Sequence, residues 1–464
     1  MSTDANCYAC PVAAGPLDAD VVLPGSKSLT IRALMAAALA DGDSVLAGAS
    51  TSDDARAMLD VLERLGIATT VDEEAAAIEV TGCRGHVPGQ HAVLYCGAAG
   101  AVMRFATALC AAGFGDFRLD GTARLRQRPM EPLVDALRGL GALVEFHGVE
   151  GYPPLTVHAR HLAGGPVGIS AVDSSQFASA LLMASVCAVR DVMLEVPPPI
   201  ASRPYLDVTL AVMDRFGVAT VADDDGQGGM RIIVPAPQVY RAAHVSIEPD
   251  ASAATVFLSA AALRGGRVSI TGLAPDSLQG DARFADVLER MGCAVDRAAQ
   301  WLTVVGPQPS PLTARGGGSP PLSARGAGPS PRLRAVDVDL SAMPDTVPTL
   351  AALALFADGP TRIRNVAHLR LKESDRLEAL RCELTRIGAR VDLHADGLTI
   401  HPAARYRAAT IETYDDHRMV MAFCLAGLGI DGLSVRDPDC ASKSFPGFTR
   451  RWEAMLGGGL RSTG

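Results

Sequence analysis

The sequence predicts an α/β protein with two similar domains, each made of three copies of one helix-and-strand unit. Its 464 residues are too many for a single core of ordinary size. The first observation is a repeat, in which a predicted helix ends with an apolar residue followed by glycine. These endings occur at Gly66, Gly141, Gly217, Gly292, Gly388 and Gly457, at intervals of 75, 76, 75, 96 and 69 residues. The second is a run of small and apolar residues upstream of every ending. Recurrence of this kind indicates a repeated supersecondary unit.

The helix before each glycine is amphipathic. In the fourth copy, the apolar residues have the i, i+3, i+4, i+7 spacing of a one-sided apolar face: Phe284, Val287, Leu288 and Met291. The glycine after the helix is expected to take the left-handed conformation that ends many helices. The sixth ending, Leu456-Gly457, is the most degenerate copy.

A second helix in each unit is apolar on nearly every side, which is typical of helices buried in a core. These six helices are expected at 33–40, 101–112, 177–189, 253–263, 347–356 and 419–428. Short alternating segments such as Gly266–Ile270 and Thr361–Arg364 follow them and predict strands. Each unit therefore consists of a buried helix, a strand, an amphipathic helix and further strands.

The longest interval contains an insertion. Between Gly306 and Arg334 the chain includes SPLTARGGG and then SPPLSARGAG, a tandem duplication rich in Pro, Gly and Ser. Such a segment cannot bury a core, so we expect a surface loop at a position that tolerates insertion. A functional tail is the alternative.

Composition argues against several classes of protein. Asp and Glu outnumber Lys and Arg by 51 to 42, and the net charge of −9 disfavours nucleic acid or an anionic membrane as partner. No segment has the ~18–20 continuous apolar residues of a membrane span, and residues 1–20 lack the pattern of a signal peptide. The ten cysteines are scattered, and the pair Cys7 and Cys10 lacks further metal ligands nearby, which favours thiols in a reducing cytoplasm.

Polar residues gather at the starts of the buried helices. In the first unit, Pro24-Gly25-Ser26-Lys27-Ser28 precedes Arg32, which lies one turn beyond Ser28 on the same face. Free backbone N–H groups, the helix dipole and two cations make such a start suitable for binding an anion. A Ser-capped helix with solvated cations is the alternative, but cations are unusual on a helix that is otherwise buried.

The second and third units carry similar clusters. Gly97-Ala98-Ala99-Gly100 would let a ligand approach the backbone, although a tight turn alone would explain it. Asp173-Ser174-Ser175-Gln176 offers hydroxyl groups and an amide to a phosphate or a sugar-like ring, or simply caps its helix. Arginines beside proline suit bidentate capture of phosphate or carboxylate, and they occur in two later loops, Arg124–Pro129 and Ser202–Tyr205.

The second half of the chain adds carboxylates. Asp345 opens a buried helix, either as a cap or as a functional group. The next helix is expected to start at Leu371, so that Lys372 and Arg376 share a face beside Glu373, an ion-pair partner or a proton donor. Eight cations recur at equivalent helix or loop positions and predict one or two ligands of high negative charge: Lys27, Arg32, Arg104, Arg128, Lys372, Arg376, Arg418 and Lys443.

Eight motifs together resemble those of the 5-enolpyruvylshikimate-3-phosphate synthase family. In chain order, from Leu23 to Phe448, they are LPGSKSLTIRAL, GAAGAVMRF, RQRPMEPLVDAL, SSQFASALL, SRPYLDVT, LRLKESDRL, TYDDHRM and SKSFPGF. No single motif is decisive. Eight in the family order over nearly the whole chain are highly specific.

The resemblance implies both a fold and a reaction. The family has two similar domains, each of three βαβαββ units, in an inside-out α/β barrel arrangement. If this chain divides as the family does, residues 22–243 form the first domain and residues 1–21 plus 244–464 form the second, with the insertion at about 306–334. The family transfers the enolpyruvyl group of phosphoenolpyruvate to the 5-hydroxyl of shikimate 3-phosphate by addition and elimination, and releases phosphate. We expect no metal and no other cofactor, and a monomer in the cytoplasm.

The resemblance also implies roles for residues that match the motifs. Asp345 would accept the 5-hydroxyl proton, Glu373 would donate a proton to the methylene carbon, and Lys27 would be the third catalytic residue. Shikimate 3-phosphate would be bound by Lys27, Ser28, Arg32, Ser174, Ser175, Gln176, Ser202, Tyr205, Asp345, His368 and Lys372. Phosphoenolpyruvate would be bound by Lys27, Gly100, Arg128, Gln176, Arg376, Arg418 and Lys443.

The chain departs from the family pattern at two places. The loop that usually reads Asn-Ala-Gly-Thr is Ala98-Ala99-Gly100-Ala101, which lacks an amide and a hydroxyl. His368 stands where many relatives carry Asn, and a histidine can still form a hydrogen bond there. Because Gly100 is retained, we expect glyphosate, the family's phosphoenolpyruvate-competing inhibitor, to fit.

Three alternatives were weighed. The enolpyruvyl transferase that acts on a UDP-amino sugar shares the repeat, but it has a reactive cysteine in the loop that here is Arg124–Pro129, and it lacks the DDHRM and KESDR strings. A non-catalytic metabolite-binding paralogue would explain Ala98 and Ala101, yet every charged catalytic candidate persists. A scaffolding role would have to involve the insertion.

Overall fold

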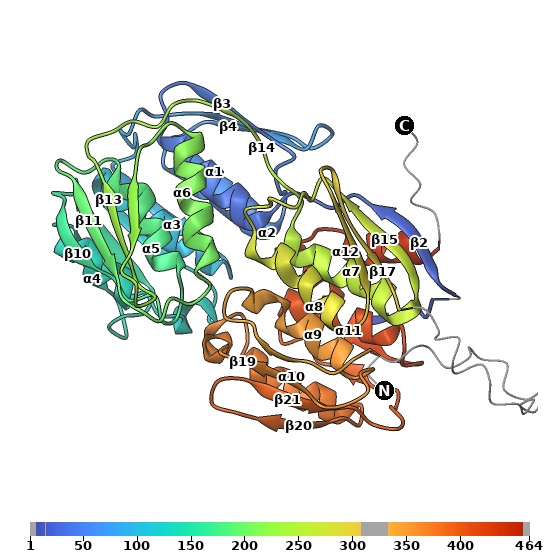
Figure 1. The fold of residues 1–464 in the computed structure, drawn as a ribbon. Coiled ribbons are helices and arrows are strands. Elements are labelled where there is room, and N and C mark those ends of the chain that lie inside the picture. Colours follow the sequence, from blue (N-terminus) through green and yellow to red (C-terminus); the bar gives the residue numbers. More distant parts are fainter. Residues whose placement is uncertain (1–5, 14, 308–332, 458–464) are drawn as a thin grey trace, which may run out of the picture.

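The computed structural model describes residues 6–13, 15–307 and 333–457. Figure 1 shows two lobes, which we call the first half (residues 24–249) and the second half (the described residues before 24 and after 249). Each half has its own hydrophobic core, one from Leu29 to Ile247 and the other from Cys10 to Leu23 together with Ala251 to Met455. Most of the predicted insertion, residues 308–332, lies outside the described residues.

The repeated unit is a βαβαββ element, as predicted. In the second unit the first two strands of the sheet are parallel, the last two are antiparallel to their neighbours, and the strand order is β6-β7-β9-β8. Its elements are β6 (His91–Tyr95), α3 (Gly100–Ala112), β7 (Phe114–Asp120), η1 (Leu125–Gln127), α4 (Glu131–Gly139), β8 (Leu143–Phe146) and β9 (Leu155–Arg160).

The first and third units complete the first half. The third comprises β10 (Gly165–Gly168), α5 (Gln176–Ser185), β11 (Val192–Val196), α6 (Pro204–Arg215), β12 (Val221–Asp224) and β13 (Met230–Val234). The first comprises α1 (Lys27–Leu39), β3 (Asp43–Ala47), α2 (Asp53–Arg64), β4 (Thr69–Asp72), β5 (Ala77–Thr81) and, from much later in the chain, β14 (His244–Ser246).

The second half repeats this plan. The fourth unit is β2 (Leu17–Val21), α7 (Ala251–Arg264), β15 (Gly266–Thr271), η2 (Gly280–Arg283), α8 (Phe284–Arg290), β16 (Ala294–Ala298) and β17 (Trp301–Val305). The fifth is β18 (Asp337–Asp339), η4 (Pro344–Thr346), α9 (Val347–Ala354), β19 (Thr361–Arg364), η5 (Ala367–Leu371), α10 (Arg376–Arg386), β20 (Arg390–Leu393) and β21 (Leu398–His401). The sixth is β22 (Thr410–Ile411), α11 (His417–Gly427), β23 (Ser434–Arg436), η6 (Pro438–Lys443), α12 (Phe448–Leu456) and β1 (Cys7–Ala9).

Each half includes a strand that comes from a distant part of the chain. The early strand β2 runs parallel to β15 in the second half, and β14 runs parallel to β3 in the first half. We therefore propose two domains that correspond to the two halves, with the first domain extended through β14 beyond residue 243.

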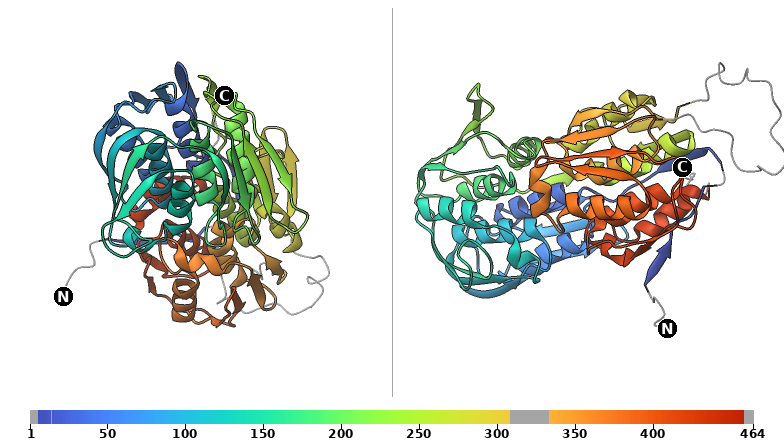
Figure 2. Two further views of the ribbon diagram at one scale, coloured as in Figure 1. Left: turned by 90° about the vertical axis from the view of Figure 1, so that its left-hand side faces the viewer. Right: turned by 90° about the horizontal axis from the view of Figure 1, so that it is seen from below.

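The predicted all-apolar helices are the buried ones. They are α1, α3, α5, α7, α9 and α11, and nearly every residue of each is buried. Figures 1 and 2 show that the sheets lie on the outside of both halves, around these helices. The α/β, inside-out fold class is thus confirmed.

The glycine endings are left-handed in five units. The φ angles of Gly66, Gly141, Gly217, Gly292 and Gly388 lie between 76° and 112°. The prediction is wrong for Gly457, whose φ is −79°. In the other units the chain turns back at this glycine to add the last strands of the sheet, whereas in the sixth unit β1 from the start of the chain pairs antiparallel with β23 instead.

One helix start was also predicted wrongly. The helix expected from Leu371 begins at Arg376, because the side chain of Asp375 caps it by accepting a hydrogen bond from the Glu378 N–H. Lys372 and Glu373 therefore lie on the loop between η5 and α10, and Lys372 does not share a helical face with Arg376.

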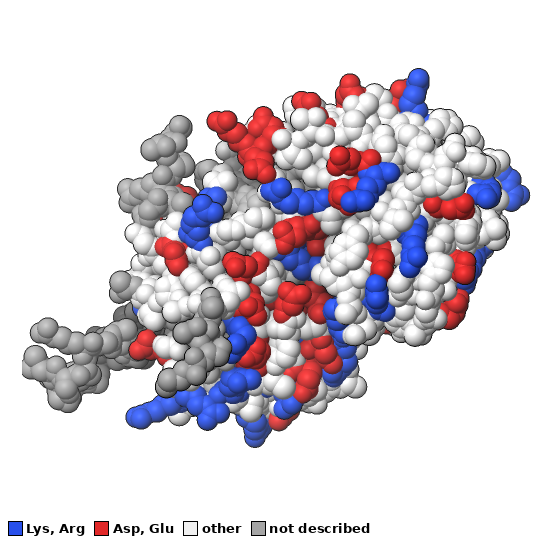
Figure 3. Space-filling view, turned by 180° about the vertical axis from the view of Figure 1, so that it is seen from behind, with Lys and Arg blue, Asp and Glu red and all other residues white. Residues whose placement is uncertain are grey.

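The surface carries mixed charge. On the face shown in Figure 3, Lys and Arg side chains lie among Asp and Glu side chains rather than apart from them. Among the described residues, no helix combines the length and the apolar composition that a bilayer span requires.

Candidate active site

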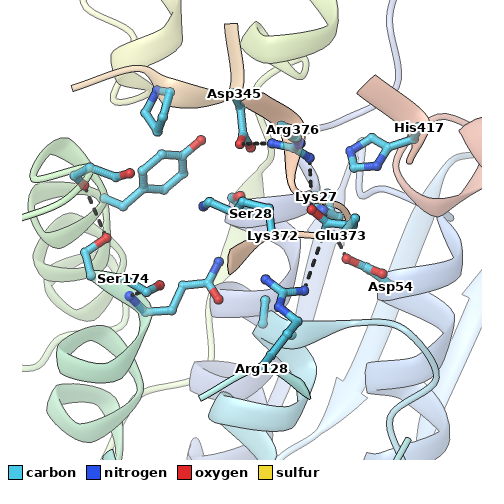
Figure 4. Close-up of a pocket in the computed structure, with 17 residues that line it drawn as sticks. Lys27, Ser28, Asp54, Arg128, Ser174, Asp345, Lys372, Glu373, Arg376 and His417 are labelled. Carbon is cyan, nitrogen blue, oxygen red and sulfur yellow. Dashed lines mark hydrogen bonds and ion pairs between the residues drawn. The ribbon is translucent and has the colours of Figure 1, made fainter. Parts of the chain in front are cut away.

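A cavity between the two halves is lined by starts of buried helices and by adjoining loops (Figure 4). The first half contributes Lys27, Ser28, Asp54, Gly100, Ala101, Arg128, Ser174, Ser175, Gln176, Ser202 and Tyr205. The second half contributes Pro344, Asp345, Lys372, Glu373, Arg376 and His417. Thirteen of the residues predicted from the sequence thus meet around one space, although they are spread over some 350 positions of the chain.

Arg376 is the centre of the charge cluster. Its side chain is 1% exposed, and its three guanidinium nitrogens donate to three carboxylates, those of Asp416 at 2.8 Å, Asp345 at 2.8 Å and Glu373 at 2.9 Å. Asp416 also caps α11 and accepts a hydrogen bond from Ser374. The start of α10 is therefore fixed to the start of α11 by charge-assisted hydrogen bonds.

Glu373 joins the halves at the cavity. Its carboxylate lies 3.4 Å from Nη1 of Arg128 in the first half and 3.9 Å from Nζ of Lys443. Burial opposes the charged form of Glu373, but the surrounding cations, Arg128 foremost, outweigh it and hold the pKa of this carboxyl well below its usual range. Among these cations, Glu373 is thus a carboxylate.

Gly100 leaves room for Arg128. A Cβ at Gly100 would lie 2.4 Å from Cζ of Arg128 and 2.5 Å from its Nη1. The guanidinium therefore lies directly against the first turn of α3, where only a glycine permits its present position.

Asp54 lies between two lysines from opposite halves. It is 3.0 Å from Nζ of Lys27 and 2.9 Å from Nζ of Lys443, which also donates to the carbonyl of Ala98. Sequence reasoning missed Asp54 because an acidic residue in the first turn of α2 looks like a helix-dipole partner. A signal was present, since Asp54 falls on the apolar stripe that continues through Met58, Val61 and Leu62.

Arg418 and His417 begin α11 and carry buried donors without partners. The Nε and Nη1 atoms of Arg418 have none among the described residues, and its Nη2 lies 3.7 Å from Asp345. Both ring nitrogens of His417 also lack a hydrogen-bond partner in the described part of the chain. Burial, with Arg418 and Lys27 nearby, holds the pKa of His417 well below its usual value, so the ring is neutral. Its position in the DDHR string was the available signal, but no role was predicted.

Hydroxyl groups line the opposite wall. Ser174 accepts a hydrogen bond from the N–H of Gln176, whose side-chain oxygen accepts from Arg104 at 2.6 Å. The Ser175 hydroxyl donates to the carbonyl of Ser202, a residue in the left-handed region with φ 55°. These contacts orient a row of hydroxyls at the start of α5.

Asp345 and Lys372 have shifted pKa values. Burial would raise the pKa of Asp345, but Arg376, Lys372 and Arg418 outweigh burial and lower it below its usual range. Burial lowers the pKa of Lys372 to about 8, and Arg376 acts in the same direction. The carboxylate of Asp345 is therefore charged beside these cations, whereas Lys372 titrates near neutral pH.

Four predicted residues do not line the cavity. Arg32 lies behind it, with its guanidinium bonded to Thr209, Ser179 and two backbone carbonyls. His368 faces a separate hollow between the halves, and its Nε2 has no partner among the described residues. Arg418 and Lys443 stand just outside the lining and reach it through Asp345 and Asp54.

The free space is small. The cavity has a volume of about 40 Å³, whereas pockets for small molecules usually measure about 300–1,000 Å³. Cations and carboxylates from both halves are paired directly across it. A space of this size does not hold ligands of the predicted size.

Solved structures of other proteins share this fold. An EPSP synthase from Acinetobacter baumannii matches with a TM-score of 0.76 and 23% identity, covering 97% of this chain and 98% of that one. The enolpyruvyl transferase NikO from Streptomyces tendae matches with a TM-score of 0.71 and 19% identity, covering 96% of each chain. At these identities the likeness defines the fold, which is that of the enolpyruvyl transferases.

Sequence comparison is more specific. A family model described as EPSP synthase (3-phosphoshikimate 1-carboxyvinyltransferase) matches residues 12–452. A 3-phosphoshikimate 1-carboxyvinyltransferase from Trichormus variabilis is 41% identical, covering 97% of this chain and 100% of that protein. One of the same name from Syntrophobacter fumaroxidans is 42% identical, covering 95% and 97%.

The chain therefore belongs to the EPSP synthase (3-phosphoshikimate 1-carboxyvinyltransferase) family. It is an enzyme, a transferase of the shikimate pathway that moves an enolpyruvyl group, and it serves aromatic amino-acid biosynthesis. The relatives favour neither the UDP-amino-sugar enzyme nor a non-catalytic paralogue.

Proposed function

We propose that the cavity binds shikimate 3-phosphate and phosphoenolpyruvate together and joins them through the residues described above. One observation carries this proposal: Arg128 and Arg418, each 4% exposed, keep buried guanidinium N–H groups that have no partner in the described part of the chain, beside a cavity rich in cations. Buried donors without acceptors are costly, at roughly 1–3 kcal/mol each. Phosphate or carboxylate oxygens of a ligand would satisfy them, since guanidinium binds such groups in a planar, bidentate manner.

Phosphoenolpyruvate would bind on the cation side. Its phosphate and carboxylate would be held by Lys27, Gly100, Arg128, Gln176, Arg376, Arg418 and Lys443. All five of these cations pair with Asp54, Asp345 or Glu373. A phosphate carries more charge than a carboxylate, so the ligand would displace these internal partners.

Shikimate 3-phosphate would bind against the hydroxyl wall. Its phosphate would lie at the start of α5, where Ser174, Ser175 and Gln176 present polar groups beside free backbone N–H groups. Ser28, Ser202, Tyr205 and Lys372 would complete the contacts. Arg32 and His368 are assigned to the same ligand by motif, and both would need to turn toward it from their present positions.

In the addition step, Asp345 would take the proton of the 5-hydroxyl while that oxygen bonds to C2 of phosphoenolpyruvate. A carboxylate with a lowered pKa is a weak base. Two anionic ligands among the same cations would neutralise the charge that now lowers the pKa of Asp345, so binding would itself strengthen the base.

Glu373 would act on the methylene carbon. When phosphoenolpyruvate pairs with Arg128, the pKa of Glu373 would rise and allow it to carry the proton that it donates to C3. The product of addition is a tetrahedral intermediate with a methyl group. In elimination, Glu373 would take one methyl proton back, the double bond would re-form, and the C2–O bond to phosphate would break. The phosphate would leave with the proton that Asp345 took from the 5-hydroxyl, so that both carboxylates are restored.

The halves would exclude water during the reaction. Cross-half contacts already surround the site, including the Ser202 N–H to the Ser341 carbonyl at 3.0 Å and Lys443 to Asp54. Closing on the ligands would protect the intermediate from hydrolysis.

We also propose a monomer in the cytoplasm with small molecules as its partners. Both halves of one chain supply the lining, so no second subunit is needed to complete the site. All ten cysteines are free thiols, which persist in reducing compartments. The net charge of −9 would repel nucleic acid.

The test is release of phosphate when both substrates are mixed with the protein. We expect one phosphate per shikimate 3-phosphate consumed, and no release when either substrate is omitted. Arg126→Ala is a suitable control variant, because this exposed side chain pairs with Asp120 away from the cavity. Binding of both substrates without any phosphate release would refute the proposal.

A further inference from the structure

Arg124 connects the two halves through backbone groups. It precedes η1 in the first half, and its Nε donates to the carbonyls of Lys372 at 3.2 Å and Glu373 at 3.0 Å in the second half. Its Nη2 donates to the carbonyls of Arg370 at 3.3 Å and Lys372 at 2.8 Å. One side chain thus holds three carbonyls, that of Arg370 in η5 and those of Lys372 and Glu373 in the loop after it, about 250 residues further along the chain.

The three carbonyls have no other donor within residues 6–13, 15–307 and 333–457. The Arg370 carbonyl lies in the last turn of η5 and the other two follow the end of η5, and the last carbonyls of a helix lack partners inside it. Lys372 is extended, with φ −88° and ψ −154°, and α10 begins only at Arg376. The backbone that carries Lys372 and Glu373 therefore belongs to neither helix, and Arg124 supplies its hydrogen bonds.

The same loop holds the side chain of Glu373. Arg124 and Arg128 flank η1, so one turn of 3-10 helix places one guanidinium on the backbone of Glu373 and the other on its carboxylate at 3.4 Å. These two contacts determine the position and direction of Glu373 relative to the first half.

Arg126 lies between Arg124 and Arg128 but makes no such contact with the described residues of the second half, so contact across the halves is not a general property of arginines in this segment. Its guanidinium forms a bidentate pair with Asp120 at 2.8 and 2.7 Å, inside the first half and half exposed to solvent. Arg124 and Arg126 are two residues apart, yet Arg124 contacts the second half and Arg126 contacts the first.

We propose that Arg124 is a positioning residue that, on closure of the halves, places the Lys372–Glu373 segment against the first-half wall of the cavity. This inference rests on the proposed roles of Lys372 and Glu373. Arg124 itself does not line the cavity. A guanidinium suits the task because its fixed fork bridges several carbonyls at once, which an ammonium cannot do with the same geometry.

The test compares Arg124→Ala and Arg124→Lys with Arg126→Ala as the matched control. Displacing a catalytic group by about 1 Å slows a reaction by roughly 100-fold, so we expect Arg124→Ala to lower kcat by roughly 10- to 100-fold. The KM values for both substrates should change by less than about threefold, since the cationic and hydroxyl groups that bind them remain. Arg124→Lys should recover part of kcat, and Arg126→Ala should match the parent.

Two further measurements separate positioning from loss of structure. Calorimetric titration with shikimate 3-phosphate should give one site per chain in Arg124→Ala, and its melting temperature should stay within about 4 °C of the parent. A kcat within twofold of the parent, an equal loss in Arg126→Ala, or a loss that follows the number of titrated sites would overturn the inference. If the parent itself releases no phosphate, the proposed function fails instead.

Discussion

Replacing Gly100 by alanine probes how closely Arg128 lies against the start of α3. The added Cβ would be 2.4 Å from Cζ of Arg128, while ordinary contacts begin at 3.4 Å. The guanidinium must therefore retreat by at least 1.0 Å. Its direction of retreat is limited, because Arg128 is buried and paired with Glu373.

The expected effect is a loss of phosphoenolpyruvate affinity. A hydrogen bond between charged groups contributes roughly 1.5–3 kcal/mol, which corresponds to roughly 10- to 150-fold in an equilibrium constant. We therefore expect the KM for phosphoenolpyruvate to rise by roughly 10- to 100-fold in Gly100→Ala. The KM for shikimate 3-phosphate should change little, because its proposed ligands lie on α1 and α5 and on other loops.

The assay is steady-state phosphate release with each substrate varied in turn. Gly139→Ala is the control, since an added Cβ there meets the Val167 side chain at an ordinary 3.5 Å. A KM for phosphoenolpyruvate within twofold of the parent, or an equal rise for both substrates, would show that Arg128 is not held as reasoned.

Four other predictions follow from the same site. Asp345→Ala should lower kcat by at least roughly 100-fold while calorimetry still detects both ligands, and normal turnover would rule out this base. Because Lys372 has a pKa of about 8 and is cationic only below it, kcat/KM for shikimate 3-phosphate should fall as pH rises through 8; Lys372→Arg should abolish that limb, and a limb unchanged by the substitution would exclude Lys372 as its source. Deleting Pro307–Pro331 should leave turnover nearly unchanged, and a large loss would reveal a functional insertion. Glyphosate should inhibit in competition with phosphoenolpyruvate, because Gly100 is retained; an inhibition curve that stays flat to millimolar concentration would contradict this.

The ion pairs around the cavity explain why charge alone did not identify every residue of the site. Lys27 and Lys443 were predicted from motifs, but their common partner Asp54 was not, because its neighbours in sequence show an ordinary helix start. Arg32 was predicted as a ligand from its spacing to Ser28, yet the structure satisfies its donors with Thr209 and Ser179, which come from other helices.

Local patterns in the sequence determined the repeated unit, the buried helices and most of the cavity lining. The apolar runs of α3 and α11, and the polar residues at their starts, are properties of a few consecutive positions, so periodicity is enough to read them. Only the tertiary structure decided that Lys443 reaches Asp54 and that Arg124 reaches the backbone of Glu373. Such contacts join positions separated by hundreds of residues, and packing selects them from many partners that the local sequence leaves equivalent.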